Sequence, residues 1–264
     1  MIKEYKKYNI TYNIIFICIL IFLLCNYIIY FSPLNNYPSS DIISVLLFGA
    51  LLDINIVVSK EFFRFFTYGF LHLDLLHLLF NLIALNTLSK IIQNAYGKYK
   101  MLIIILISII GAGLMSFFIE KNSIIIGLSG GIYGLLGAYI VIIFDRGLYK
   151  IPVIKNNLIT IIGLNIGLSL LPGISFFGHL GGFITGFLVS LTIKNKLLSL
   201  KPMQKNAKIS LVILFVFMIF NLTIQINKDI DISVIEYYQY VVEDLGIDIY
   251  ADKLKEDIIK YEKR

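Results

Sequence analysis

The sequence predicts an all-α membrane protein, a polytopic helical bundle of about seven transmembrane helices. The chain of 264 residues is 58% hydrophobic and only 15% charged, whereas soluble domains are roughly 45–50% apolar and about 25% charged. The apolar residues also gather in runs close to the ~20 residues that a helix needs to cross a bilayer. These two observations exclude a soluble enzyme, a disordered chain and a disulfide scaffold.

Seven apolar runs are predicted to span the membrane. They are 9–31, 70–89, 101–119, 129–144, 156–171, 178–193 and 207–226. The first run follows Lys3, Lys6 and Lys7, as in a signal peptide, but it is too long for the apolar part of one and no small-residue cleavage site follows it. We therefore interpret it as a retained helix. The two cysteines, Cys18 and Cys25, lie inside this run and do not report on the redox compartment.

The positive charges predict the orientation, because Lys and Arg concentrate in cytoplasmic loops. With the N-terminus inside, 14 of the 23 basic residues fall in cytoplasmic segments. These segments are 1–8, 90–100, 145–155 and 194–208. The external loops contain only Lys60, Arg64 and Lys121. We expect a multi-pass protein of the cell membrane with its N-terminus in the cytoplasm and its C-terminus outside, and the net charge of +6 then implies no nucleic-acid partner.

The chain divides into a short cytoplasmic N-terminus (1–8), a membrane domain (9–226) and a polar extracytoplasmic tail (227–264). The external loop 32–69 is too apolar to be simply solvated, and short helices in the membrane interface are expected within it. The tail is expected to be solvated, with a docking element for substrates or partners as the alternative. The abundance of Ile, Asn and Lys suggests an AT-rich, bacterial genome.

Polar side chains inside membrane spans are costly and are functional candidates by default. All three histidines, His72, His77 and His179, fall within predicted spans. Asn81 lies four residues after His77 and hence on the same helix face, and Ser129 begins the short fourth span. Because the second, fourth and sixth spans all enter from outside, these side chains are expected at similar depth near the outer ends of three helices.

Small residues spaced by four predict close contact between the fourth and sixth spans. The residues concerned are Gly130, Gly134, Gly137, Gly182 and Gly186. This contact would bring Ser129 Oγ within hydrogen-bond reach of His179, and a serine becomes a nucleophile when an adjacent base takes its proton. His77, Asn81 and nearby backbone N–H groups are the available donors for an oxyanion. Tyr133, one turn after Ser129 on the same face, is placed to buttress the His179 ring.

Each feature also has a structural alternative. A membrane serine often bonds only its own i−4 carbonyl, glycine pairs often serve packing alone, and membrane histidines form structural hydrogen bonds or bind haem or a metal. The absence of an HExxH motif argues against a zinc protease. Asp74, near the outer end of the second span, is expected to face the lipid headgroups.

Taken together, three blocks of sequence resemble the rhomboid intramembrane serine proteases. The blocks are His72-Leu-Asp-Leu-Leu-His77-Leu-Leu-Phe-Asn81, Gly127-Leu-Ser129-Gly130 with Tyr133, and Gly178-His179-Leu-Gly-Gly182 with Gly186. The resemblance runs from about residue 48 to residue 194, which would be the catalytic core. The extra span 207–226 is similar to the six-plus-one arrangement of many rhomboids.

The resemblance implies a role for each matching residue. Ser129 would be the nucleophile and His179 its general base, in a dyad without a carboxylate. His77 and Asn81 would stabilise the oxyanion together with the Ser129 backbone N–H. Gly127 would form the tight turn before the nucleophile.

The resemblance further implies that Tyr133 packs on the catalytic histidine and that His72 supports the outer end of the second span. No cofactor or metal is implied. The expected partners are the lipid bilayer and transmembrane protein substrates, which would enter laterally past the fifth span and the loop 171–177. Phe176 and Phe177 would close the site from above. The sequence does not set the oligomeric state.

Two positions depart from the family pattern. Phe63 precedes Arg64 where Trp is usual, and Gln93 stands four residues before Gly97 where Glu is common. Neither departure touches the expected chemistry. The rival interpretation is a non-catalytic rhomboid-like protein that binds transmembrane helices, and such a protein would not need both Ser129 and His179.

Overall fold

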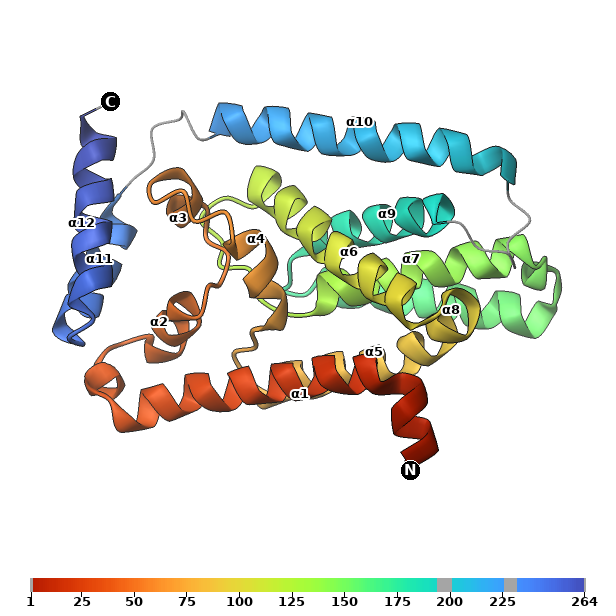
Figure 1. Ribbon diagram of the computed structural model, residues 1–264, viewed down its shortest axis with the longest axis horizontal. Helices are drawn as coiled ribbons and strands as arrows, with labels where there is room; N and C mark the ends of the chain where they lie inside the picture. Colours follow the sequence, from red (N-terminus) through yellow and green to blue (C-terminus); the bar gives the residue numbers. More distant parts are fainter. Residues whose placement is uncertain (1, 194–200, 226–231, 264) are drawn as a thin grey trace.

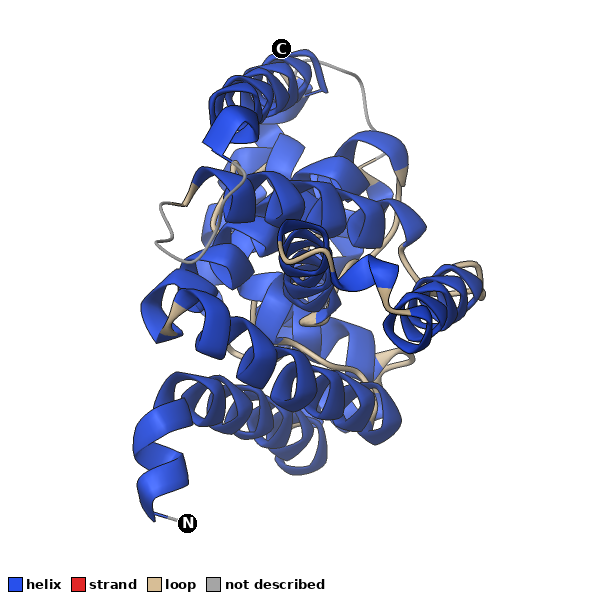
Figure 2. Cartoon of the chain, turned by 90° about the vertical axis from the view of Figure 1, so that its right-hand side faces the viewer, coloured by secondary structure: helices blue, strands red, loops and turns tan. Residues whose placement is uncertain are grey.

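A computed structural model describes residues 2–193, 201–225 and 232–263 of the chain. Seven long helices occupy the positions of the seven predicted spans (Figure 1). They are α1 (Ile2–Phe31), α5 (Leu75–Tyr96), α6 (Lys98–Ile119), α7 (Ser129–Asp145), α8 (Pro152–Ser169), α9 (Phe176–Thr192) and α10 (Lys201–Gln225). Within the described ranges the chain has no strand (Figure 2). Part of the predicted connection 194–208 and the start of the predicted tail lie outside the described residues.

Length and hydropathy separate the seven helices into two groups. Four are long and apolar enough to cross a bilayer: Tyr8–Phe31, Leu75–Tyr96, Lys98–Ile119 and Lys205–Ile224. α7 and α9 are apolar but have only 17 residues each, which gives them a length of about 25 Å against a hydrocarbon core of about 30 Å. α8 has 18 residues, and its first turns carry Lys155, Asn156 and Asn157. The short fourth span expected from the sequence is therefore present as α7.

The second span begins later than predicted, at Leu75 rather than residue 70. The reason is a helix cap: the Asp74 carboxylate accepts a hydrogen bond from the backbone N–H of His77 at 2.8 Å, which satisfies one of the free donors of the first turn. Asp74 is thus the N-cap of α5 and is exposed. That it faces the lipid headgroups stays a prediction. His72 lies before the helix, not within it.

Helices α6, α7 and α9 form the centre of the bundle, between α1 on one side and α10 on the other (Figure 1). The predicted contact between the fourth and sixth spans is confirmed. A side chain added at Gly186 of α9 would place its Cβ 2.3 Å from the Cα of Gly134 on α7. Because only glycine permits this approach, the two helices meet backbone to backbone, and the residues at their N-terminal ends are brought together.

The segment between α1 and α5 folds into short helices. They are η1 (Pro33–Asn36), α2 (Ser40–Leu47), α3 (Asp53–Val57), α4 (Arg64–Thr67) and η2 (Tyr68–Phe70). Two helices of the tail, α11 (Ser233–Asp244) and α12 (Asp248–Glu262), pack against this segment at one end of the molecule (Figure 1). We call residues 32–74 together with α11 and α12 the cap.

Apolar side chains from both parts of the cap share one core, in which Val45 and Leu46 are buried with Val241 and Leu254. The described part of the tail is therefore folded and docked, and the prediction of a solvated tail is wrong. The short helices expected in the external loop are present, and the tail packs against them.

An ion network lies inside the cap. Arg64 is 1% exposed, and its Nε lies 2.7 Å from Glu61 Oε2. The remaining guanidinium donors reach the carbonyls of Leu46 and Ala50 at 2.9 and 2.8 Å and the hydroxyl of Tyr250 at 3.1 Å. The ammonium of Lys253 on α12 lies 3.0 Å from Glu61 Oε1. The neighbouring Phe63 is 55% exposed, as an interfacial anchor would be.

Candidate active site

Ser129 is the first residue of α7, and the loop that leads to it is held by backbone hydrogen bonds. Leu51 of the cap and Ile125 exchange two such bonds, and the N–H of Gly127 donates to the carbonyl of Tyr68 at 3.0 Å. These bonds satisfy a non-helical backbone that leads into the bundle, where unpaired polar groups are costly.

Gly127 forms the turn before Ser129, as the resemblance implied. Its φ of +109° lies in the region that favours glycine. A Cβ at this position would lie 2.8 Å from the imidazole of His77 and 3.9 Å from Ser129 Oγ. The missing side chain therefore leaves the space in which the His77 ring sits next to the serine.

His77 and Asn81 lie on one face of α5 and both line the same cavity, as their spacing predicted. The Asn81 side chain is 6% exposed, and its amide nitrogen donates to the backbone carbonyl of His77 at 2.9 Å. A primary amide nitrogen carries two hydrogens. The hydrogen not used by this bond is available to an acceptor in the cavity.

His179 lies in the first turn of α9, which is capped by Ser175: its hydroxyl accepts a hydrogen bond from the N–H of Gly178 at 2.9 Å. The imidazole stacks on the ring of Tyr133, with centroids 4.0 Å apart and planes 12° from parallel. The expected packing of Tyr133 on His179 is thus present. The Nδ1 atom of His179 lies 2.7 Å from Ser169 Oγ at the end of α8.

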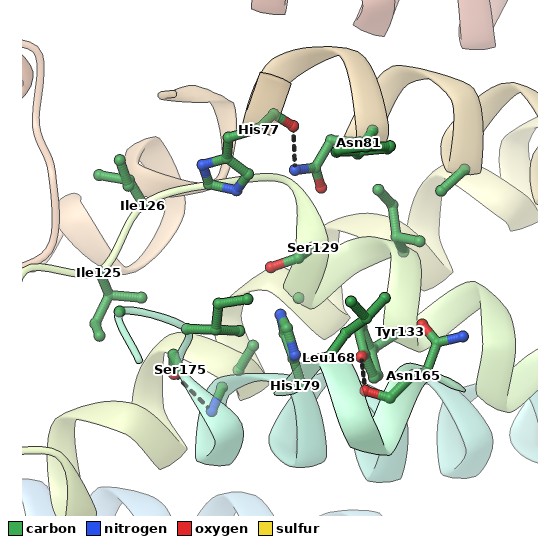
Figure 3. A pocket seen from close by; sticks show the side chains of 18 of the residues that line it. His77, Asn81, Ile125, Ile126, Ser129, Tyr133, Asn165, Leu168, Ser175 and His179 are labelled. Carbon is green, nitrogen blue, oxygen red and sulfur yellow. Dashed lines mark hydrogen bonds between the residues drawn. The ribbon is translucent and has the colours of Figure 1, made fainter. Parts of the chain in front are cut away.

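One cavity of about 720 Å³ is lined by His77, Asn81, Ser129, Tyr133 and His179. The Ser129 hydroxyl lies between the rings of His77 and His179, which come from α5 and α9 (Figure 3). Among the described residues no hydrogen bond joins Ser129 to His179, so the bond expected from the sequence stays a prediction. Chemically, the arrangement offers a serine hydroxyl, a nearby imidazole and amide donors to a molecule in the cavity.

His72 is buried, at 1% exposure, and does not line the cavity. Its ring lies edge-on to that of His77, with centroids 5.0 Å apart and planes at 67°. His72 thus contacts a residue that lines the cavity, and it lies outside the span predicted for it. Its supporting role stays a prediction.

The loop expected to close the cavity lies on its rim. Pro172, Gly173, Ile174 and Ser175 line the cavity, whereas Phe176 and Phe177 begin α9 and are not among the lining residues. The expected closure by these two phenylalanines is not seen. Glu120 holds the loop: it accepts hydrogen bonds from the Ser175 hydroxyl at 2.5 Å and from the backbone N–H of Phe177 at 3.0 Å.

Sequence reasoning missed four polar residues around the cavity: Asp74, Glu120, Asn165 and Ser169. Asp74 had a usable signal, since Asp is a preferred N-cap before an apolar run. Asn165 and Ser169 are spaced by four within the apolar fifth span, so they share a face, but the sequence does not say which helix that face contacts.

No group of three or more His, Cys, Asp and Glu residues suited to a metal ion occurs within the described parts of the chain.

Comparisons with known proteins agree with this geometry. The family model described as the Rhomboid domain matches residues 59–196. RHOMBOID-like protein 4 of Arabidopsis thaliana is 32% identical over 158 residues, which cover 59% of this chain and 40% of that protein. Rhomboid protease AarA of Providencia stuartii is 31% identical over 189 residues (62% and 66%), and Rhomboid protease GluP of Bacillus subtilis is 29% identical over 174 residues (66% and 34%).

The chain spans between 40% and 52% of the length of three of its curated plant relatives, RHOMBOID-like proteins 4, 1 and 6. The matched region begins at residue 59, before Tyr68, and extends beyond His179, so it contains every residue that lines the cavity. Since the family model covers more than half of the 264 residues, and the helices are apolar and multiple, the chain is a multi-pass membrane protein that belongs to the rhomboid family.

Proposed function

We propose that the protein is an intramembrane serine endopeptidase that cleaves transmembrane segments of membrane proteins, with Ser129 as the nucleophile and His179 as the general base. The observation that carries this proposal is the position of the Ser129 hydroxyl in a cavity shared with His77, Asn81 and His179. Two of the similar proteins, GluP and AarA, bear the name of protease.

In the proposed first step, Ser129 Oγ attacks the carbonyl carbon of the scissile peptide bond while its proton passes to Nε2 of His179. The carbonyl oxygen becomes an oxyanion. Its donors would be the Asn81 amide, the His77 ring and the backbone N–H of Ser129, which lies at the N-terminus of α7, where the helix dipole favours negative charge.

Collapse of this intermediate breaks the C–N bond, and the proton on His179 goes to the leaving amine. Water then attacks the acyl-enzyme ester, again with His179 as the proton acceptor, and releases the second product and the free Ser129 hydroxyl. No step requires a metal or cofactor.

A substrate helix would reach the cavity from the lipid, past α8 and the loop 171–177. The outward face of α8 is apolar and exposed, with Ile159 at 58% and Leu164 at 63%, as a lipid-facing helix would be. With the N-terminus in the cytoplasm, as the positive charges favour, the cavity and the cap would lie toward the outer side of the membrane.

The experiment is cleavage of a single-span membrane substrate by the purified protein in detergent, with EDTA present. Wild type is compared with Ser129→Ala and with Ser190→Ala, a matched control in which a buried serine of α9 that does not line the cavity loses its hydroxyl, which donates to the Phe187 carbonyl of its own helix. Cleavage by wild type and Ser190→Ala but not by Ser129→Ala is expected. Equal cleavage by all three would overturn the assignment of Ser129. Binding of the substrate without cleavage by any of them would favour the non-catalytic helix-binding rival.

A further inference from the structure

Ser169, the last residue of α8, lies at the centre of a hydrogen-bond network behind the His179 ring. The residue is 3% exposed. Its Oγ lies 2.7 Å from Nδ1 of His179, 2.7 Å from the hydroxyl of Tyr133 and 2.7 Å from the backbone carbonyl of Asn165. The Tyr133 hydroxyl also lies 2.9 Å from that carbonyl. One serine of the fifth span thus contacts both rings of the stacked pair.

The stack and the serine constrain different motions of the imidazole. Stacking on Tyr133 fixes the plane of the ring, but it does not distinguish the two nitrogens, because a half-turn about the Cβ–Cγ bond leaves the ring in the same plane. A hydrogen bond at Nδ1 distinguishes them. It places Nε2 on the opposite edge of the ring, which faces the Ser129 hydroxyl (Figure 3).

One arrangement of the hydrogens in this network sets the tautomer. The carbonyl of Asn165 can only accept hydrogen bonds. If the Ser169 hydroxyl donates to this carbonyl, as serines in helices commonly do at i−4, its oxygen is free to accept from Nδ1–H of His179. Tyr133 then donates either to the same carbonyl or to Ser169. Every group is satisfied, and Nε2 of His179 carries no proton.

We propose that Ser169 is a positioning residue that holds His179 in the tautomer with the proton on Nδ1, so that Nε2 can accept the proton of Ser129. This inference rests on the proposed function and adds a residue from α8 to it. When Nε2 takes the proton, both ring nitrogens become donors. Ser169 remains an acceptor for Nδ1–H, because its own hydroxyl hydrogen is still donated to the Asn165 carbonyl. The bond from His179 to Ser169 becomes charge-assisted and stronger.

The direct test is nitrogen NMR of the protein labelled with ¹⁵N at histidine, at a pH where the rings are neutral. The chain has only three histidines, so the His179 signals are assigned by their loss in His179→Asn. We expect wild-type His179 to be protonated at Nδ1 alone. Protonation at Nε2 instead would overturn the proposal without the need of any variant at Ser169.

Variants sharpen the test. Ser169→Ala is expected to give His179 a mixture of tautomers and to lower kcat, with KM little changed. A fall in kcat of about 10- to 100-fold is expected, by analogy with the loss of a hydrogen-bond partner that orients a metal-binding histidine. Ser169→Thr, which retains a hydroxyl, is expected to restore both the tautomer and most of kcat. Ser190→Ala is the matched control. Wild-type tautomer and kcat in Ser169→Ala would overturn the proposal.

The two proposals fail in different ways. If the wild-type protein cleaves no substrate, the proposed function fails, and the tautomer measurement still decides whether Ser169 orients His179. If the protein cleaves substrate but neither the tautomer of His179 nor kcat changes in Ser169→Ala, only the positioning role fails.

Discussion

The cap and the cavity both bury polar side chains, but they satisfy them differently. In the cap, the Glu61–Arg64 pair is enclosed by protein partners on every side, from the carbonyls of Leu46 and Ala50 to Tyr250 and Lys253. In the cavity, His179 has Tyr133 and Ser169 behind it and open space in front. A buried network that is complete stabilises one fold, whereas one that is satisfied from one side only leaves a reactive face for a substrate.

This difference predicts that the two regions respond differently to substitution. Changes in the cap are expected to lower stability with little effect on turnover per folded molecule. Changes in the cavity are expected to lower turnover with little effect on stability. The two regions share a border: Leu51 pairs with Ile125, the Tyr68 carbonyl accepts from Gly127, and Asp74 caps α5 at His77. Arg64 and Glu61 do not line the cavity, so the separation can be tested at these two residues.

The largest effect is expected for His179→Ala. Loss of the base should lower kcat/KM by at least about 10³-fold, as is usual for members of a nucleophile–base pair, while the unfolding midpoint in detergent changes little. Cleavage of the single-span substrate and thermal unfolding followed by circular dichroism would be measured on the same preparation. Retained cleavage would break the comparison, since the cavity would then hold no essential base.

Arg64→Ala should show the opposite pattern. Removal of the guanidinium leaves Glu61 and two carbonyls buried without it, and breaking a buried ion pair on one side costs about 3–5 kcal/mol. The free energy of unfolding would be measured by denaturant titration in mild detergent, and kcat at a temperature where the variant stays folded. The double variant Glu61→Leu/Arg64→Leu should recover part of the loss, because it removes both buried charges and leaves Lys253, whose side chain is 49% exposed, in contact with solvent. A fall in kcat with unchanged stability would contradict the structural role of the cap.

Gly127→Ala tests the boundary between the two regions. The new methyl group would be strained by the positive φ and would press on the His77 ring, so we expect a loss of about 1–3 kcal/mol in stability together with a marked fall in kcat. Gly163→Ala on α8, where an added Cβ meets no atom within 4 Å, is the matched control. If both variants behave as wild type, the turn does not depend on glycine.

The smallest expected effect is the acid sensitivity of the cap. Burial alone would raise the pKa of the Glu61 carboxyl, but Arg64 and Lys253 outweigh burial and hold that pKa below its ordinary value. A carboxyl with a lowered pKa stabilises the fold above its unfolded pKa of about 4.3 and loses this contribution as the pH falls through the folded value. The unfolding midpoint should therefore fall more between pH 7 and pH 3 in wild type than in Glu61→Gln. Equal drops would show that Glu61 contributes nothing to the pH dependence.

Local signals in the sequence were enough to predict the seven long helices and that Ser129, His179, His77 and Asn81 lie near one another. Apolar runs located the seven helices, glycine spacing predicted the contact of α7 with α9, and the i,i+4 spacing of His77 and Asn81 placed them on one face. The start of α5 was misplaced by five residues, because hydropathy does not register the Asp74 cap.

Two other long-range arrangements could not be predicted from one sequence. The docking of the tail depends on pairs such as Glu61 and Lys253, which are 192 residues apart. The position of Ser169 behind His179 depends on how α8 meets α9, and a polar residue in an apolar span does not reveal its partner. The tail and the fifth span are accordingly where the structure adds most to the sequence.

The most direct test of the central claim is reaction of the folded protein with a fluorophosphonate probe, followed by mass spectrometry of the labelled peptide. The account predicts one label per chain, on Ser129, and none after heat unfolding, because only a serine activated by its neighbours reacts. Labelling of another serine in the folded protein, or no labelling at Ser129, would contradict the account and favour a rhomboid-like protein that binds transmembrane helices without cleaving them.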